Sequence, residues 1–239
     1  MGGVPVRRIR WRGTARVVPS RFPPVDLFER VADAADRDAV IAVESLTNER
    51  LRDESGELRR VAEADRVSGP GSSYVMAPFT HISPAGGRFS DGGAGAYYAA
   101  RRHETAIRET VYHRERFLAA TAEPPIDLEM RVIEADIDGR FNDIRAQRDE
   151  LPGLYSPDEY GLSQSWARRL RAEGSNGVAY ASVRHEGGEC VAVFKPRLVK
   201  RARQAEHLLY RWDGTRISEV FELTLRLRDG PGRVDAETE

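Results

Sequence analysis

The chain has 239 residues, of which 40% are hydrophobic, enough for one large domain with a substantial core rather than a disordered chain. Its formal net charge of -1 argues against general nucleic-acid binding, and its one cysteine, Cys190, excludes an intrachain disulfide and a Cys-rich zinc site. No apolar stretch approaches the roughly 20 residues of a membrane span, and the N-terminus lacks an apolar signal segment, so we expect a cytoplasmic protein.

The first 73 residues are predicted to hold one strand, two helices and a long loop. Polar and apolar residues alternate toward a strand at 14–18, which consecutive prolines then end. Apolar side chains recur at helical spacing over 25–35 and 38–48. The stretch 49–73 is charged and then rich in glycine and serine, so most of it is predicted to be loop.

The rest of the chain reads as strands and helices separated by turns. The predicted strands lie at 95–100, 126–137, 178–183, 190–194, 206–212 and 217–227. The predicted helices lie at 102–118 and 160–173, and the tail from residue 229 is expected to be frayed. Because strands and helices mix without a regular βαβ rhythm, the pattern predicts an α+β fold rather than a doubly wound sheet.

Arg88 is the first candidate for a binding site, because it follows Gly86 and Gly87. A guanidinium group beside glycines can meet a phosphate bidentately, since glycines let backbone and ligand approach closely. The simpler alternative is a surface arginine on a turn.

Tyr98 lies on the predicted strand that follows this glycine-rich bend. Its ring could stack on a nicotinamide and its hydroxyl could bond a ribose, or the side chain could simply pack in a half-buried strand. The adjacent Tyr97 must point to the opposite face of the strand. Periodicity alone does not say which of the two tyrosines faces a pocket.

Glu109 lies on the next predicted helix, with small neighbours at Thr105 and Ala106. A carboxylate there can stabilise an oxocarbenium-like transition state or orient a nucleophile on a ribose, whereas the alternative is a solvated helix glutamate among arginines.

Ser182 lies at the end of a predicted strand. Its hydroxyl can form a hydrogen bond to an amide or phosphate of a ligand, or it can have no role. It is not predicted to be an acyl-transfer nucleophile, because no G-x-S-x-G elbow surrounds it.

Two further features carry weaker signals. The five histidines show no metal-binding spacing such as H-E-x-x-H, so we expect no metal site. The basic stretch 195–203, KPRLVKRAR, could contact nucleic acid or an acidic partner, although such a run is more often a solvated loop or strand edge.

Taken in order along the chain, these residues resemble the RES domain family, which is named for its arginine, glutamate and serine. The matching pieces are GGRFS at 86–90, YAARRHETAIRE at 98–109 and GSNGVAYASVR at 174–184. Arg16 matches the family's early strand arginine, with Arg21 as a weaker candidate. The family's offset from tyrosine to glutamate favours Tyr98, rather than Tyr97, as the pocket residue.

The resemblance implies a single RES domain over residues 1–239, with an ADP-ribosyltransferase-like core of mixed β-sheets flanked by helices at about 12–194. A helical insert at about 26–73, which compact family members lack, can cap the pocket, mediate oligomerisation or bind a partner. C-terminal strands and a frayed tail fill 195–239.

The resemblance also implies the toxin of a bacterial RES–Xre toxin–antitoxin module, which cleaves the nicotinamide–ribose bond of NAD. Glu109 would be the main catalytic carboxylate, assisted by Arg88 and Tyr98. NAD, a substrate rather than a metal-dependent cofactor, would be bound by Arg16, Arg88, Tyr98 and Ser182. The expected partners are NAD, inorganic phosphate and an Xre-type antitoxin, with oligomerisation open and no membrane.

Three functions remain open at this point. The first is an NAD phosphorylase or glycohydrolase, and the second is a protein ADP-ribosyltransferase that uses the same site. Dependence on phosphate separates these two. The third is a non-catalytic module that binds nucleic acid or a partner through 195–203, which a nucleic-acid complex with a steep salt dependence would favour.

Overall fold

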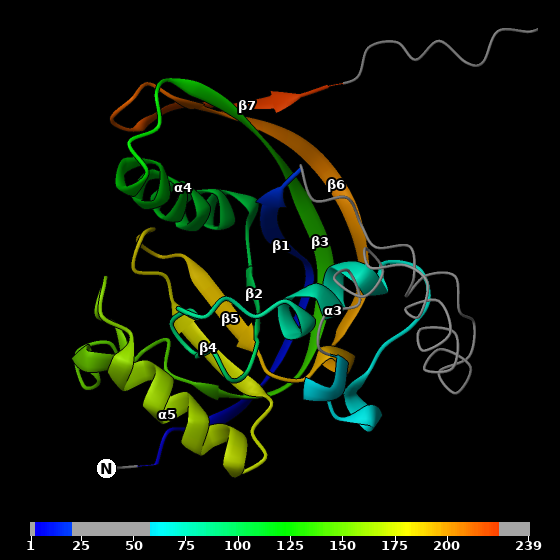
Figure 1. Cartoon of the computed structure of the whole chain (residues 1–239). Coiled ribbons are helices and arrows are strands. Elements are labelled where there is room, and N and C mark those ends of the chain that lie inside the picture. The colour runs from blue at the N-terminus through cyan, green and yellow to red at the C-terminus, as the bar shows by residue number, and fades with distance from the viewer. Residues whose placement is uncertain (1–2, 21–57, 225–239) are drawn as a thin grey trace, which may run out of the picture.

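The computed structural model describes residues 3–20 and 58–224 (Figure 1). The helices expected at 25–35 and 38–48, most of the expected insert, the weaker candidate Arg21 and the tail from residue 229 lie outside the described residues.

Seven strands of the described residues form one sheet, in the order β1–β2–β5–β4–β3–β6–β7. They are β1 (Val6–Pro19), β2 (Tyr97–Ala100), β3 (Ile126–Asp143), β4 (Gly177–Ala181), β5 (Glu189–Val193), β6 (Val199–Trp212) and β7 (Ile217–Leu223). Strand β1 also pairs with β3, so the five strands β1, β2, β5, β4 and β3 close into a circuit from which β6 and β7 extend. The neighbours are antiparallel except β3 and β4.

Three α-helices lie around this sheet in the described residues (Figure 1). They are α3 (Ser72–Thr80), α4 (His103–Ala120) and α5 (Gly161–Ala172). Short 3₁₀ turns occur at Leu58–Arg60, Glu63–Asp65, Pro152–Leu154 and Pro196–Leu198. A mixed sheet flanked by helices confirms the predicted α+β fold.

The long strands extend well beyond the segments predicted from the sequence. β1 begins eight residues before the expected start at Thr14, since Ile9 and Trp11 face the core while Arg8 and Arg10, which alternate with them, are exposed. The basic stretch 195–203 is a 3₁₀ turn followed by the first residues of β6, and not a loop throughout. Both β1 and β6 pair with β3, and this pairing keeps their arginine-rich segments in strand conformation.

Successive side chains on the short strands β2, β5 and β4 point to opposite faces of the sheet, and each face packs into its own hydrophobic core. On β5, Cys190 and Ala192 enter the core that packs against α4 and α5, whereas Val191 and Val193 enter the core that includes α3. β2 follows the same rule, so Tyr97 is fully buried in the α3 core and Tyr98 packs against the other one. The two tyrosines therefore face opposite sides, as the period of a strand requires.

Helix α4 follows β2 after two residues, which fixes the position of the segment that carries Glu109. Thr105 and Ala106 in its first turn are buried, and the helix packs on β1 and β2. None of the helices among the described residues is long and apolar enough to cross a membrane.

Tyr97 provides a direct test of this core. Its hydroxyl is buried without a hydrogen-bond partner among the described residues, and burial raises the pKa of the phenol to about 12. We predict that Tyr97→Phe raises the free energy of unfolding by about 1 kcal/mol, because it removes an unsatisfied buried polar atom. Tyr98→Phe is the matched control. It removes a hydroxyl that is hydrogen-bonded to Phe89 and Ser90, so it should lower the free energy of unfolding. Equal losses for both variants in urea unfolding would contradict this arrangement.

Candidate active site

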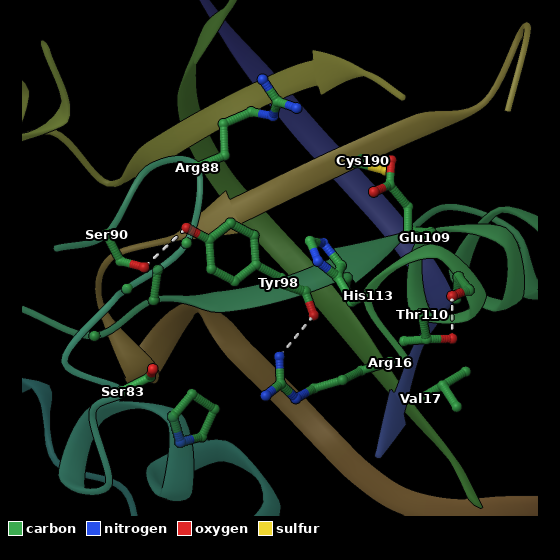
Figure 2. A pocket seen from close by; sticks show the side chains of 18 of the residues that line it. Arg16, Val17, Ser83, Arg88, Ser90, Tyr98, Glu109, Thr110, His113 and Cys190 are labelled. Atoms are coloured by element: carbon green, nitrogen blue, oxygen red, sulfur yellow. Dashed lines mark hydrogen bonds between the residues drawn. The ribbon is translucent and has the colours of Figure 1, made fainter. Parts of the chain in front are cut away.

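A pocket of about 480 Å³ lies where β1, β2, α4 and the loop between α3 and β2 meet (Figure 2). This volume is in the range of small-molecule sites, about 300–1,000 Å³. Four of the five predicted site residues line it, and each comes from a different segment. They are Arg16 on β1, Arg88 on the loop before β2, Tyr98 on β2 and Glu109 on α4.

Ser182, the fifth predicted residue, lies behind Glu109 instead of on the pocket wall. Its hydroxyl donates a hydrogen bond of 2.6 Å to Oε1 of Glu109, and the side chain is only 2% exposed. The same Oγ accepts hydrogen bonds from the backbone N–H groups of Arg184 and His185, at 3.1 and 3.0 Å. The turn after β4 places the Ser182 hydroxyl against Glu109 on α4. Ser182 can therefore orient the Glu109 carboxylate, but it does not line the pocket.

Arg16 is a half-buried cation whose charge has no carboxylate partner among the described residues. Its Nη1 donates to the backbone oxygen of Tyr98 at 3.2 Å, and the guanidinium lies 5.2 Å from the ring centre of Tyr97. Desolvation lowers the pKa of Arg16, partly offset by the two tyrosines. These contacts fix the direction of the side chain and leave its charge uncompensated.

Arg88 is held in the same way, through neutral groups. It is 7% exposed, and its Nη1 donates to the backbone oxygens of Leu154 and Ser156 at 3.0 and 2.7 Å. The guanidinium lies 4.9 Å from the ring centre of Tyr160. No carboxylate among the described residues forms an ion pair with it. Because a desolvated charge is costly without a counter-ion, two such arginines in one pocket favour an anionic ligand.

Tyr98 faces the pocket with its ring, because its hydroxyl is already engaged. The oxygen accepts a hydrogen bond from the backbone N–H of Phe89 at 2.8 Å. It also shares a hydrogen bond of 3.0 Å with Ser90 Oγ, which Figure 2 shows. Burial raises the pKa of the phenol, so it stays neutral. Of the two roles considered for Tyr98, ring stacking agrees with this geometry better than a hydrogen bond to a ribose.

Gly86 and Gly87 line the pocket, and the turn that carries Arg88 also needs both of them to be glycine. Gly86 has a φ of +67°, and a Cβ there would lie 2.1 Å from the backbone oxygen of Ser90. A Cβ on Gly87 would meet the Tyr98 hydroxyl at 3.0 Å. The glycines thus allow the Arg88 turn to close onto Tyr98.

Several pocket residues were not singled out from the sequence. His113 lies one helical turn after Glu109 on α4, and this i,i+4 spacing was the signal that could have identified it. Tyr160 lies against Arg88. No local pattern reveals Tyr160 as a pocket residue, because its partner Arg88 is distant in the sequence.

The basic stretch 195–203 is largely neutralised. Arg197 pairs with Asp65 at 2.5 Å, and Arg201 and Arg203 pair with Asp136 and Glu134 on β3.

The described residues contain no group of three or more His, Cys, Asp or Glu side chains that could hold a metal ion.

Together, the fold and the pocket define an α+β domain with a small-molecule site that combines two unpaired arginines with an oriented carboxylate. The RES domain model matches residues 63–213, more than half of the chain, and the chain belongs to the RES domain family. Arg16 precedes the matched segment, although it lines the same pocket as the matched residues.

Two known proteins illustrate the similarity. The uncharacterized protein y4oC of Sinorhizobium fredii (strain NBRC 101917 / NGR234) is 34% identical over 209 residues, which cover 86% of this chain and 85% of that protein. A chain of the crystal structure of the M. tuberculosis MbcT–MbcA toxin–antitoxin complex aligns with a TM-score of 0.46 and 13% identity, over 83% of this chain and 86% of that one.

The glycine turn gives a stability prediction for the site. Gly86→Ala should lower the free energy of unfolding by about 1–3 kcal/mol, because alanine is strained at positive φ and its Cβ meets the Ser90 carbonyl. Gly161→Ala is the control, since no atom lies within 4 Å of its added Cβ. If chemical denaturation gave the two variants the same stability, the described turn would be wrong.

Proposed function

We propose that this chain is a RES-type toxin that degrades NAD by cleaving the bond between nicotinamide and ribose, with phosphate or water as acceptor. One observation carries the proposal: Arg16 and Arg88, both without carboxylate partners among the described residues, share a pocket with a glutamate whose carboxylate is held by Ser182. Membership of the RES domain family supports the same activity.

In this proposal the two arginines bind the diphosphate of NAD. A guanidinium group meets phosphate oxygens through a planar set of donors, and both side chains are already held by hydrogen bonds to backbone oxygens. The neutral ring of Tyr98 provides a flat surface for the nicotinamide. Little ordering of these side chains is then needed when the ligand binds.

Glu109 acts on the charge that develops during bond cleavage. The nicotinamide leaves as a neutral group with the electron pair of the C–N bond, so positive charge develops on the anomeric carbon. A carboxylate in a preorganised, partly desolvated site stabilises that charge more strongly than water does. Ser182 holds Oε1, and the other carboxylate oxygen accepts no hydrogen bond from the described residues.

The family also leads us to propose an Xre-type antitoxin as partner and the cytoplasm as the location. Transfer of ADP-ribose to a protein would use the same pocket, and product analysis separates it from phosphorolysis and hydrolysis. The nucleic-acid hypothesis is weakened, because Arg197, Arg201 and Arg203 are paired with carboxylates.

Glu109→Gln tests the catalytic role. This change keeps the shape and removes the charge, so NAD consumption should fall about 10²–10³-fold, as when one oxyanion-type contact is removed. The measurement is mass analysis of the products of NAD with and without phosphate. Phosphorolysis predicts a phosphorylated ADP-ribose only when phosphate is present, and hydrolysis predicts ADP-ribose in both samples. Unchanged NAD consumption by Glu109→Gln would remove Glu109 from the mechanism.

Ser182→Ala tests whether the serine positions the carboxylate. Hydrogen bonds to charged groups contribute about 1.5–3 kcal/mol, so we expect a loss in kcat of roughly 10- to 100-fold. The KM for NAD should change little, since Ser182 does not line the pocket. Ser165→Ala, an exposed serine on α5, is the control. A rise in KM at constant kcat would instead assign Ser182 to ligand binding.

A further inference from the structure

His113 is a pocket residue that the proposed bond cleavage does not use. It extends from α4 into the pocket beside Tyr98 and Glu109 (Figure 2). Residues four apart on a helix lie on the same face, so the imidazole and the Glu109 carboxylate approach the pocket from one side. Neither ring nitrogen has a hydrogen-bond partner among the described residues, and the ring lies edge-on to that of Tyr112, at 5.4 Å between centres.

The surroundings of His113 keep its ring neutral. Partial desolvation and then the nearby positive charges lower its pKa to about 4. These charges belong to Arg184 on the turn after β4, Arg88 on the loop before β2, and Arg116 and Arg114 on α4. Glu109 is the carboxylate on the same helix face, and the pocket groups Tyr98, Tyr180 and Cys190 stay uncharged because burial raises their pKa values. The imidazole therefore has a free lone pair at neutral pH.

We propose that His113 is a further catalytic residue, which accepts the proton of the incoming acceptor at the mouth of the NAD pocket. The proposal rests on the proposed function and assigns a residue to its second half, the attack on the ribose. The acceptor that needs this base is water, because hydrogenphosphate carries anionic oxygens and can attack carbon without first losing a proton. Of the arginines near His113, Arg116 and Arg184 pair with Asp158, whereas Arg88 has no carboxylate partner among the described residues.

The proposed step balances in atoms and charge. The acceptor oxygen forms a bond to the anomeric carbon of the ribose while the bond from that carbon to the nicotinamide nitrogen breaks. The electron pair of the broken bond leaves with the nicotinamide, and the O–H proton of the acceptor passes to the imidazole and then to solvent. An oxygen bonded to a developing cation is a strong acid, so even a weakly basic imidazole can remove its proton.

His113→Gln in the full chain tests the proposal. Loss of a general base typically costs at least about 10²-fold, so NAD turnover in water should fall by about that factor. The replacement should fold, because position 113 is exposed and glutamine is a good helix former. His207→Gln makes the same change on an exposed part of β6, outside the pocket, and is the matched control.

Azide provides the decisive second measurement, because this anion attacks carbon without losing a proton. We expect azide to restore turnover in His113→Gln, with ADP-ribosyl azide as the product in mass analysis. It should not restore Glu109→Gln, which lacks the carboxylate that stabilises the transition state.

The outcomes separate this inference from the proposed function. If wild type and His207→Gln consume NAD and His113→Gln does so equally fast, His113 is not the base and the proposed function stands. A slow His113→Gln variant that azide does not restore also overturns the assignment. If the wild type releases no nicotinamide from NAD, the proposed function and this inference both fail.

Discussion

The pairing of β1 with β2 is the constraint on which the site depends. Ala15 and Ala100 form the register pair between these strands, and both are small and buried, so α4 can pack closely over them. This pairing closes the circuit of five strands and brings Arg16 within hydrogen-bond distance of the Tyr98 backbone. A cation from the start of the chain thereby joins an aromatic ring and a carboxylate that are close together in the sequence.

The electrostatics of the pocket follow from what holds each charged group. Arg16 and Arg88 are fixed by backbone oxygens and aromatic rings, which orient a guanidinium without neutralising it. Elsewhere, arginines such as Arg145 and Arg201 form ion pairs with carboxylates. Positive charge is thus retained inside the pocket, although the whole chain has a net charge of only -1. This contrast explains how a nearly neutral protein can present a site for an anionic substrate.

The sequence predicted the parts of the site that depend on local order. Arg88, Tyr98 and Glu109 lie within one turn, strand and helix, so their order along the chain predicted their convergence. Alternation predicted that Tyr97 and Tyr98 face opposite sides, and the family resemblance selected Tyr98 as the pocket residue. The position of Ser182 was not predictable, because its contact with Glu109 joins residues 73 apart. The full length of β1 and β6 was missed for a similar reason: exposed arginines interrupt the apolar pattern, and pairing with β3 stabilises the strands regardless.

The account depends most on the binding of the NAD diphosphate by the two unpaired arginines. Calorimetric titration of NAD into the Glu109→Gln variant tests this binding most directly, because the variant should bind NAD without fast turnover. We expect saturable binding that weakens at least about tenfold when Arg16→Gln is added, given about 1.5–3 kcal/mol for hydrogen bonds to charged groups. It should also weaken with rising salt. No binding, or binding unaffected by loss of the Arg16 charge, would contradict the account.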